Sequence, residues 1–182
     1  RDGEAYRERL QARARELALM DLQAMSMSGF VSVWTQKLGG RVRPLVRECG
    51  ADPEYDKDCD DDIQRNQSFL SGHTALSFTG AGLICIQHAN IPLYGGGFPD
   101  GLACGLGLGA ASFVGVSRLI ADRHYTSDVL AGMLIGGVSG FLLPGWWHFG
   151  LFDAGRGPAK TQMIVSPFAS GDSLGLGLYG IN

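Results

Sequence analysis

The stretch Ser117-Arg118-Leu119-Ile120-Ala121-Asp122-Arg123-His124-Tyr125-Thr126-Ser127-Asp128 decides the fold, because it separates two long uncharged segments. No Asp, Glu, Lys or Arg occurs from 101 to 117 or from 129 to 152. Charged groups between apolar helices are costly unless they are used, so this stretch is the first candidate for a functional site. His124 and Asp128 are four residues apart. At that spacing the carboxylate can fix one imidazole nitrogen and leave the other as a nucleophile or base.

Two further polar stretches border apolar segments. Lys37-Leu38-Gly39-Gly40-Arg41-Val42-Arg43-Pro44 follows one of them, and Ser71-Gly72-His73 opens another. Arg118 supplies a planar cation suited to phosphate. Ser71 is a good N-cap, and a helix N-terminus favours anions. Taken alone, each stretch also fits a plainer interpretation: a polar loop with a surface Asp-His pair, or a simple helix cap.

Taken in their order along the chain, the three stretches resemble the signature of the type 2 phosphatidic acid phosphatase superfamily. This superfamily includes vanadium haloperoxidases and bacterial acid phosphatases. That signature reads Lys-x6-Arg-Pro, then Pro-Ser-Gly-His, then Ser-Arg-x5-His-x3-Asp. The third motif matches at every fixed position, whereas Leu70 stands at the proline of the second. In the first motif, Lys37 is one residue too close to Arg43, and strict spacing places Gln36 in the lysine position.

The resemblance implies an all-α helical bundle with a phosphate site at one end. It also implies phosphoryl transfer through a phosphohistidine, without a metal or another cofactor. By position, His124 is the nucleophile, Asp128 orients it, and His73 protonates the leaving oxygen. The implied phosphate-binding groups are Arg118, Arg43, Lys37, Ser71 and the Gly72 amide. Vanadate is expected as an inhibitor, and as a cofactor only in the haloperoxidase alternative.

The residue types agree with that chemistry. Phosphoryl transfer requires positioning and cationic stabilisation of the equatorial oxygens. It also requires a nucleophile and a general acid on opposite sides of the phosphorus. Two histidines, two or three cations and a helix N-terminus can supply this.

The chain has 182 residues, 45% of them hydrophobic and 18% charged, and this predicts a single ordered domain. We expect an N-terminal helix over 1–36, a catalytic core over 37–149 and a tail over 150–182. The net charge of −3 argues against a nucleic-acid partner. Two short runs in the tail, Thr161–Ser166 and Ser173–Ile181, favour a β-hairpin.

The region from Gly39 to Gln67 is expected to be a loop with an acidic second half. Asp56, Asp58 and Asp60 alternate there, but the pattern lacks the glycine and the twelfth-position glutamate of a calcium loop, which favours a solvated surface.

Core helices are expected from Ser71 to about His88, from Gly101 to about Leu119, and from about Ser127 to Trp147. Glycines recur every fourth residue in the last two, and such spacing lets helix backbones approach closely. These glycines are Gly101, Gly105, Gly109, Gly132, Gly136 and Gly140.

The four cysteines match no zinc pattern. A disulfide between Cys49 and Cys59 would close a short loop and imply an oxidising compartment, and a reduced pair is the alternative. Cys85 and Cys104 lie in apolar segments, which favours buried small hydrophobic residues.

These features predict a phosphatase acting on a lipid phosphate or diphosphate at a bacterial-type cell membrane, with an extracytoplasmic, periplasm-facing active site. The expected partners are the lipid substrate and the membrane. Two enzyme alternatives remain, a soluble periplasmic acid phosphatase and a vanadate-dependent haloperoxidase. An inactive membrane scaffold is the alternative from another class.

Overall fold

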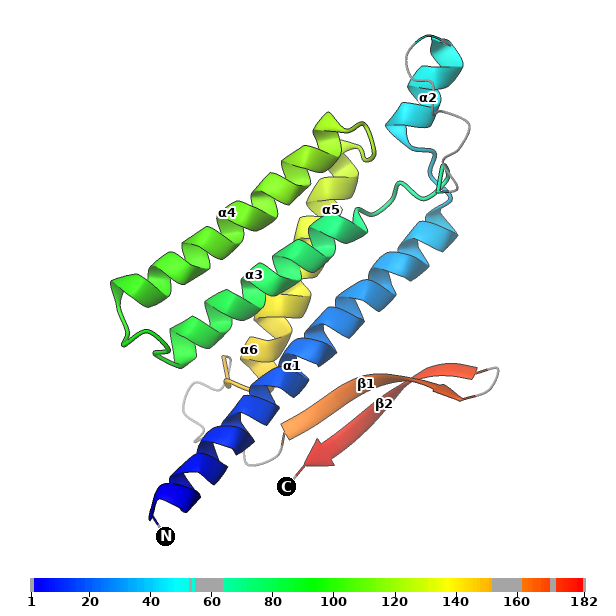
Figure 1. The fold of residues 1–182 in the computed structure, drawn as a ribbon. Coiled ribbons are helices and arrows are strands. Elements are labelled where there is room, and N and C mark those ends of the chain that lie inside the picture. The colour runs from blue at the N-terminus through cyan, green and yellow to red at the C-terminus, as the bar shows by residue number, and fades with distance from the viewer. Residues whose placement is uncertain (1, 53, 55–63, 152–161, 171–172, 182) are drawn as a thin grey trace.

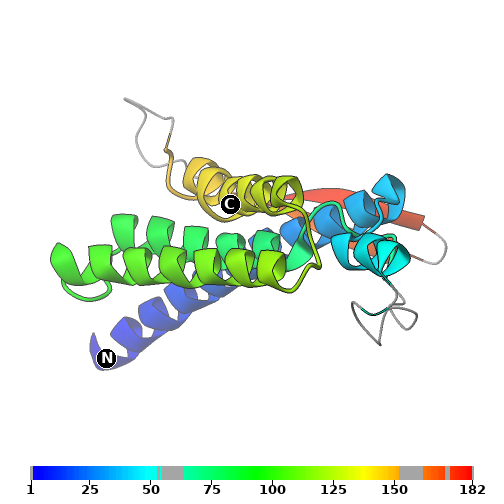
Figure 2. The same ribbon diagram turned by 90° about the horizontal axis from the view of Figure 1, so that it is seen from above.

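The protein is a bundle of antiparallel helices followed by a two-stranded hairpin (Figures 1 and 2). The computed structural model describes residues 2–52, 54, 64–151, 162–170 and 173–181. The predicted all-α bundle is confirmed. Its elements are α1 (Asp2–Gly39), α2 (Pro44–Ala51), α3 (Gly72–Asn90), α4 (Phe98–Ile120), α5 (Thr126–Gly137), the π-helix η1 (Val138–Leu142), α6 (Leu143–Trp147), β1 (Gln162–Ser170) and β2 (Ser173–Ile181).

Helix α3 is the central element of the bundle. It contacts α1, α4, α5 and η1, and Figure 1 shows it between α4 and α1. Its buried side chains are mostly small or aliphatic, and they include Ala75, Ala81, Leu83 and Ile86. Because the neighbouring helices pack against α3, its N-terminus is held in place at one end of the bundle.

Helix α5 and η1 pack directly on the backbone of α3. A Cβ atom added at Gly132 would lie 2.7 Å from the Ser71 carbonyl oxygen. At Gly136 and Gly140 it would lie closer still to the carbonyl oxygens of Ala75 and Thr79. The close helix approach predicted for this glycine series is therefore confirmed, and it places the beginning of α5 beside the beginning of α3.

The other glycine series behaves differently, and the prediction for it was wrong. At Gly101, Gly105 and Gly109, an added Cβ atom would meet no atom of the described residues within 4 Å. The glycines of α4 that meet neighbours are Gly107, near Ala81 and Ile84, and Gly115, near Val129 and Thr74. Regular spacing identifies one face of a helix, but it does not say whether a neighbouring helix covers that face.

The interpretation of Cys85 and Cys104 as unbridged hydrophobic residues was also wrong. They form a disulfide between α3 and α4, with their Cα atoms 4.5 Å apart. The two helices run side by side (Figure 2), and this brings residues separated by 19 positions into contact. Cys49 is also disulfide-bonded. Its predicted partner, Cys59, lies outside the described residues.

Helix α1 runs without interruption to Gly39, and Gly40 follows in the left-handed region with φ of 52°. The expected loop then contains a further helix, α2, at the end of the bundle where α1 ends (Figure 1). Pro44 occupies the first turn of α2, where proline has no hydrogen bond to lose. The alternating acidic residues Asp56, Asp58 and Asp60 lie outside the described residues.

The predicted C-terminal hairpin is present. Strands β1 and β2 pair antiparallel, with Ser170 opposite Ser173 and Gln162 opposite Ile181. The hairpin lies beside α1 (Figure 1), and β1 contacts that helix. A two-stranded hairpin is marginal by itself and needs a neighbouring element, and β1 contacts α1.

Two segments are long and apolar enough to cross a membrane, Phe98–Ile120 and Thr126–Trp147. Only 11% of the apolar window of α4 is buried inside the protein. Its exposed side chains include Leu106, Phe113 and Ile120. An apolar surface of this kind favours contact with lipid or with another apolar helix.

Candidate active site

Backbone hydrogen bonds bring the first two polar stretches together. The Arg43 N–H donates to the Arg65 carbonyl at 2.9 Å, and the Ser68 N–H donates to the Arg41 carbonyl at 2.9 Å. Residues 41–43 and 65–68 are therefore paired side by side. The pairing fixes Arg43 next to the segment that leads into α3.

The third stretch joins through two more backbone bonds. The Leu45 N–H donates to the Asp122 carbonyl at 2.9 Å, and the Ser71 N–H donates to the Asp128 carbonyl at 3.1 Å. Three stretches that are far apart in the sequence thus meet at the N-terminal ends of α3 and α5.

A cavity of about 220 Å³ opens at this meeting point. Four of the predicted site residues contribute to its wall: Arg43, Gly72, His73 and His124. The full lining is Gly29, Ser32, Val33, Gln36, Arg43, Gln64, Gly72, His73, Leu76 and His124.

His124 is 3% exposed, and its orientation is fixed by one bond. Its Nδ1 lies 2.7 Å from the Ser68 carbonyl oxygen. A carbonyl only accepts, so Nδ1 must carry the hydrogen, and Nε2 then keeps its lone pair. The nitrogen left for chemistry belongs to a side chain that lines the cavity.

Asp128 is completely buried and accepts three hydrogen bonds. Its Oδ1 accepts from Arg41 Nη1 at 2.6 Å. Its Oδ2 accepts from the Ser68 hydroxyl at 2.5 Å and from the Tyr125 N–H at 3.0 Å. The resemblance implies that Asp128 orients His124, but the Nδ1 hydrogen is taken by Ser68, so any orienting effect of the carboxylate passes through a third residue.

The pKa values of both site histidines are lowered. The pKa of His124 falls from 6.5 to about 4, chiefly because the imidazole is buried and then because of the Arg43 and Arg118 guanidiniums. The hydrogen bond to the Ser68 carbonyl and the charge of Asp128 act in the opposite direction and raise this pKa. The same causes, burial first and then Arg118 and Arg43, lower the pKa of His73. Burial disfavours any charge, so the part of the lowering that comes from Arg43 and Arg118 is the one that indicates a positive field suited to an anion.

Arg43 and Arg118 are the two cations that lower the pKa values of both histidines. Arg43 is 5% exposed, and its Nη2 donates to Gln64 Oε1 at 2.8 Å. Within the described part of the chain, Arg118 Nε is buried and has no hydrogen-bond partner. Two guanidiniums close enough to repel each other are stabilised by an anion between them.

Ser71 and Gly72 begin α3 as predicted. The Ser71 hydroxyl accepts from the Thr74 N–H at 3.5 Å and from the Thr74 hydroxyl at 2.9 Å, which makes Ser71 an N-cap. Ser71 is completely buried, whereas Gly72 lines the cavity. The Ser71 cap therefore positions the helix end, and of these two residues only Gly72 lines the cavity.

Lys37 does not share this cavity. Gln36 lines it, with Nε2 donating to the Leu70 carbonyl at 2.8 Å. Lys37 is exposed and borders a different cavity on α1, together with Phe30 and Trp34. Successive helix residues point about 100° apart, so only one of the two can face α3. That residue is Gln36, at the position of strict motif spacing.

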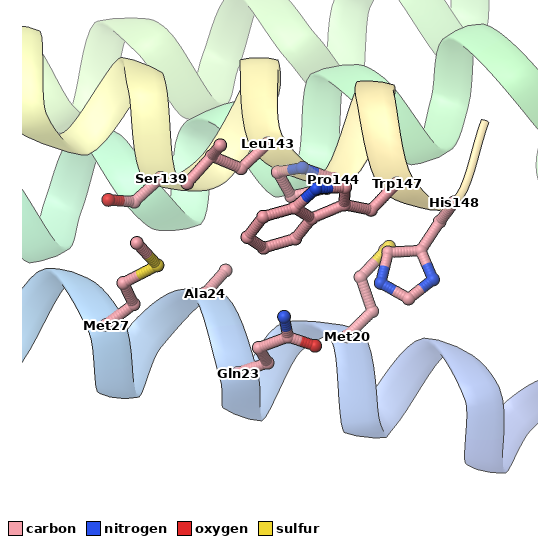
Figure 3. A pocket seen from close by; sticks show the side chains of 9 residues that line it. All are labelled: Met20, Gln23, Ala24, Met27, Ser139, Leu143, Pro144, Trp147 and His148. Carbon is pink, nitrogen blue, oxygen red and sulfur yellow. The ribbon is translucent and has the colours of Figure 1, made fainter. Parts of the chain in front are cut away.

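A second, much smaller cavity lies between α1 and the η1–α6 segment (Figure 3). Its volume is about 10 Å³, close to what one water molecule needs. Gln23 borders it, and neither polar atom of its amide has a hydrogen-bond partner within the described residues. No residue of the three polar stretches lines this cavity, so we assign it no part in the chemistry.

Sequence reasoning missed Ser68, Arg41 and Gln64. Ser68 precedes the second motif by two residues, and Arg41 lies inside the first stretch without being one of its fixed positions. The Arg41 guanidinium also lies over the Tyr125 ring, 4.1 Å from its centroid. The only sequence signal for these residues was that they are polar and close to motif positions.

Comparison with known proteins agrees with this geometry. A family model described as the PAP2 superfamily matches residues 19–150. A lipid A 1-phosphatase from Porphyromonas gingivalis is 39% identical over 80 residues, which are 44% of this chain and 16% of that protein. The chain thus matches only a small part of that relative's length. No solved structure matches the chain.

Proposed function

Because the chain belongs to the PAP2 superfamily, we propose that it is a phosphatase of lipid phosphates or diphosphates that works through a phosphohistidine and needs no metal. One observation carries this proposal. A buried histidine has Nδ1 occupied by a carbonyl and Nε2 left for attack, in a cavity that also holds a second histidine and Arg43.

The first chemical step is attack of His124 Nε2 on the phosphorus. A new N–P bond forms while the bond to the leaving oxygen breaks, and His73 gives its proton to that oxygen. Arg43, Arg118 and the Gly72 N–H stabilise the negative charge on the equatorial oxygens. Water then attacks the phosphohistidine, with His73 as the base, and releases phosphate and neutral His124.

The lowered pKa of His124 fits its role as nucleophile, whereas that of His73 must rise when the substrate binds. A pKa of about 4 keeps His124 neutral and nucleophilic at neutral pH. His73 must carry a proton to act as an acid, and burial, followed by Arg118 and Arg43, opposes this by lowering its pKa. A bound phosphate group offsets their positive charge, which raises the pKa of His73 and prepares it for proton transfer.

A lipid substrate is supported by the apolar part of the cavity. Val33 and Leu76 line it beside the polar groups. A neighbouring cavity of about 350 Å³ shares Gly29 and Val33 with it and is also lined by Phe30 and Trp34. An apolar chain attached to the phosphate can therefore continue along α1. A small soluble phosphate ester would leave this surface unused.

Location at a membrane, with the site on an extracytoplasmic face, is part of the proposal. The two apolar helices favour a membrane. Disulfide-bonded Cys49, Cys85 and Cys104 favour an oxidising compartment, as found outside the cytoplasm.

Phosphate release from long-chain phosphatidate and from an isoprenyl diphosphate, in detergent micelles with EDTA, tests the function. We expect turnover of at least one of these lipids and loss of activity in His124→Ala. His148→Ala is the control and should keep its activity, because His148 is half-buried and does not line the cavity that holds His73 and His124. An acid-labile, base-stable phosphoenzyme should accumulate in wild type after rapid quenching. Turnover by His124→Ala at the wild-type rate would contradict the mechanism, and bromide oxidation without phosphate release would contradict the function.

A further inference from the structure

Ser68 links the first polar stretch to the third through three hydrogen bonds, and it lies in the segment that leads into the second. It is completely buried. Its N–H donates to the Arg41 carbonyl at 2.9 Å, its carbonyl accepts from His124 Nδ1 at 2.7 Å, and its hydroxyl donates to Asp128 Oδ2 at 2.5 Å. Every polar group of this residue therefore has a partner, one in the first polar stretch and two in the third.

The direction of the hydroxyl bond is fixed by chemistry. An ionised carboxylate only accepts hydrogen bonds, so the Ser68 hydroxyl must be the donor. The other oxygen of Asp128, Oδ1, pairs with Arg41 Nη1 at 2.6 Å. A hydrogen bond to a charged group is stronger than one between neutral groups, so the side chain of Ser68 is firmly anchored.

This anchor controls the orientation of the histidine. The carbonyl that accepts from His124 Nδ1 belongs to the same residue whose hydroxyl is bound to Asp128. If the hydroxyl is lost, the peptide of Ser68 keeps its N–H bond to Arg41 but loses its bond to the buried carboxylate. The carbonyl can then tilt, and the imidazole that depends on it tilts as well.

We propose that Ser68 is a positioning residue, through which Asp128 holds the His124 imidazole in the Nδ1–H tautomer with Nε2 aimed at the phosphorus. The proposal rests on the proposed function of the site. Arg41 supports the same arrangement from the other side of Asp128, and its guanidinium is engaged by Asp128 and Ser127. Both of these bonds use Nη1, and Arg41 does not line the cavity, so we assign it a supporting role.

The kinetic test uses Ser68→Ala and Ser68→Cys, with Ser139→Ala as a matched control. Ser139 is also buried, at 4% exposure, and it lies in η1. It does not line the cavity that holds His73 and His124. We expect Ser68→Ala to lower kcat about 10- to 100-fold with little change in KM, as for loss of a group that orients a reacting ligand. Ser68→Cys keeps the size and a weak donor, so its kcat should fall between those of wild type and Ser68→Ala.

Inhibition by vanadate and by phosphate separates positioning from general damage. Vanadate can accept the His124 nitrogen as a fifth ligand, whereas product phosphate is held only by the cations and amides. Ser68→Ala should therefore weaken vanadate inhibition by about the same factor as kcat and leave phosphate inhibition unchanged. Equal weakening of both, or kinetics of Ser68→Ala equal to those of Ser139→Ala, would overturn the proposal.

The hydrogen on His124 Nδ1 can be followed by NMR without an activity assay. This keeps the proposal testable if Ser68→Ala folds poorly. In protein carrying ¹⁵N-labelled histidine, wild type should show a slowly exchanging Nδ1–H signal that disappears in His124→Asn. We expect that signal to exchange faster in Ser68→Cys. A His124 protonated at Nε2, or unchanged exchange in Ser68→Cys, would overturn the proposal. Either result would leave the proposed phosphatase function intact. Conversely, wild type that shows the expected signal but releases no phosphate would contradict the proposed function and not the role of Ser68.

Discussion

At the scale of single residues, the neighbouring Gln36 and Lys37 show how one position decides the charge of the site. Gln36 lines the cavity and Lys37 borders another. A lysine at the position of Gln36 would add a third cation near Arg43 and Arg118. The cavity as it stands holds a neutral amide there, bound to the Leu70 carbonyl.

The variants Gln36→Lys and Lys37→Ala test this placement. A new charge-assisted bond to phosphate contributes about 1.5–3 kcal/mol, so we expect Gln36→Lys to bind phosphate about tenfold more tightly or better. Lys37→Ala should leave the inhibition constant for phosphate unchanged. Competitive inhibition by inorganic phosphate measures both. The opposite pattern, with a loss only in Lys37→Ala, would place Lys37 at the ligand.

The pH dependence of stability is set in part by His124. Its pKa is about 4 in the folded protein against 6.5 ordinarily, so the unfolded chain takes up the proton first as the pH falls. Between these values the unfolded state binds more protons, and stability is lost as the pH decreases. We expect the Tm of wild type to fall more between pH 7.5 and pH 4.5 than that of His124→Asn. Parallel Tm profiles would show that His124 titrates normally.

Several residues that line the cavity could be predicted from the sequence, whereas the residues that support them could not. His73, Arg43 and His124 stand at fixed motif spacings, and the structure brings them to one cavity. Ser68 and Arg41 act through backbone groups and through Asp128, and their side-chain type does not reveal such contacts. The bond from His124 to a backbone carbonyl leaves no trace in the sequence.

At the scale of the helices, the contact of α5 with α3 depends on the absence of side chains. Gly136 lies against the Ala75 carbonyl and the Thr79 N–H, and both belong to the backbone of α3. A backbone atom cannot turn away as a long side chain can. Any added Cβ must therefore push the two helices apart and shift the start of α5, where Asp128 lies.

The pair Gly136→Ala and Gly105→Ala measures this contact. Overpacking in a close helix contact costs about 1–3 kcal/mol, so Gly136→Ala should lower the Tm and reduce activity. Gly105 has no described atom within 4 Å of a Cβ position. Gly105→Ala should therefore keep the activity and leave the Tm equal or slightly higher, because alanine stabilises a helix interior by about 0.5–1 kcal/mol over glycine. Thermal melts in the same detergent give the comparison. Equal Tm values for the two variants would contradict the close contact.

Among the elements, the sequence indicated the long helices but not all of their relationships. Apolar runs and terminal glycines marked α1, α3 and α4 to within a few residues. The disulfide between Cys85 and Cys104 required the register between α3 and α4, which no local pattern contains. Helix α2 is only eight residues long, and its amphipathic pattern is too short to distinguish it from a loop.

At the scale of the whole molecule, the apolar surface of α4 sets the conditions under which the protein is stable. Most of that helix is exposed, with Phe113 at 75% and Ile120 at 79%. We expect the purified protein to remain monodisperse only in detergent or lipid, and to aggregate when the detergent is diluted. Light scattering during dilution checks this. A monodisperse monomer in plain buffer would contradict a membrane location.

The bridge between Cys85 and Cys104 encloses the turn from Ile91 to Gly97 in a covalent ring. Tyr94 is 65% exposed in that turn, which makes it accessible to chymotrypsin. A cut there should leave the two halves of the polypeptide migrating as one band on a non-reducing gel. They should separate only after dithiothreitol is added, and the nicked enzyme should keep its activity until then.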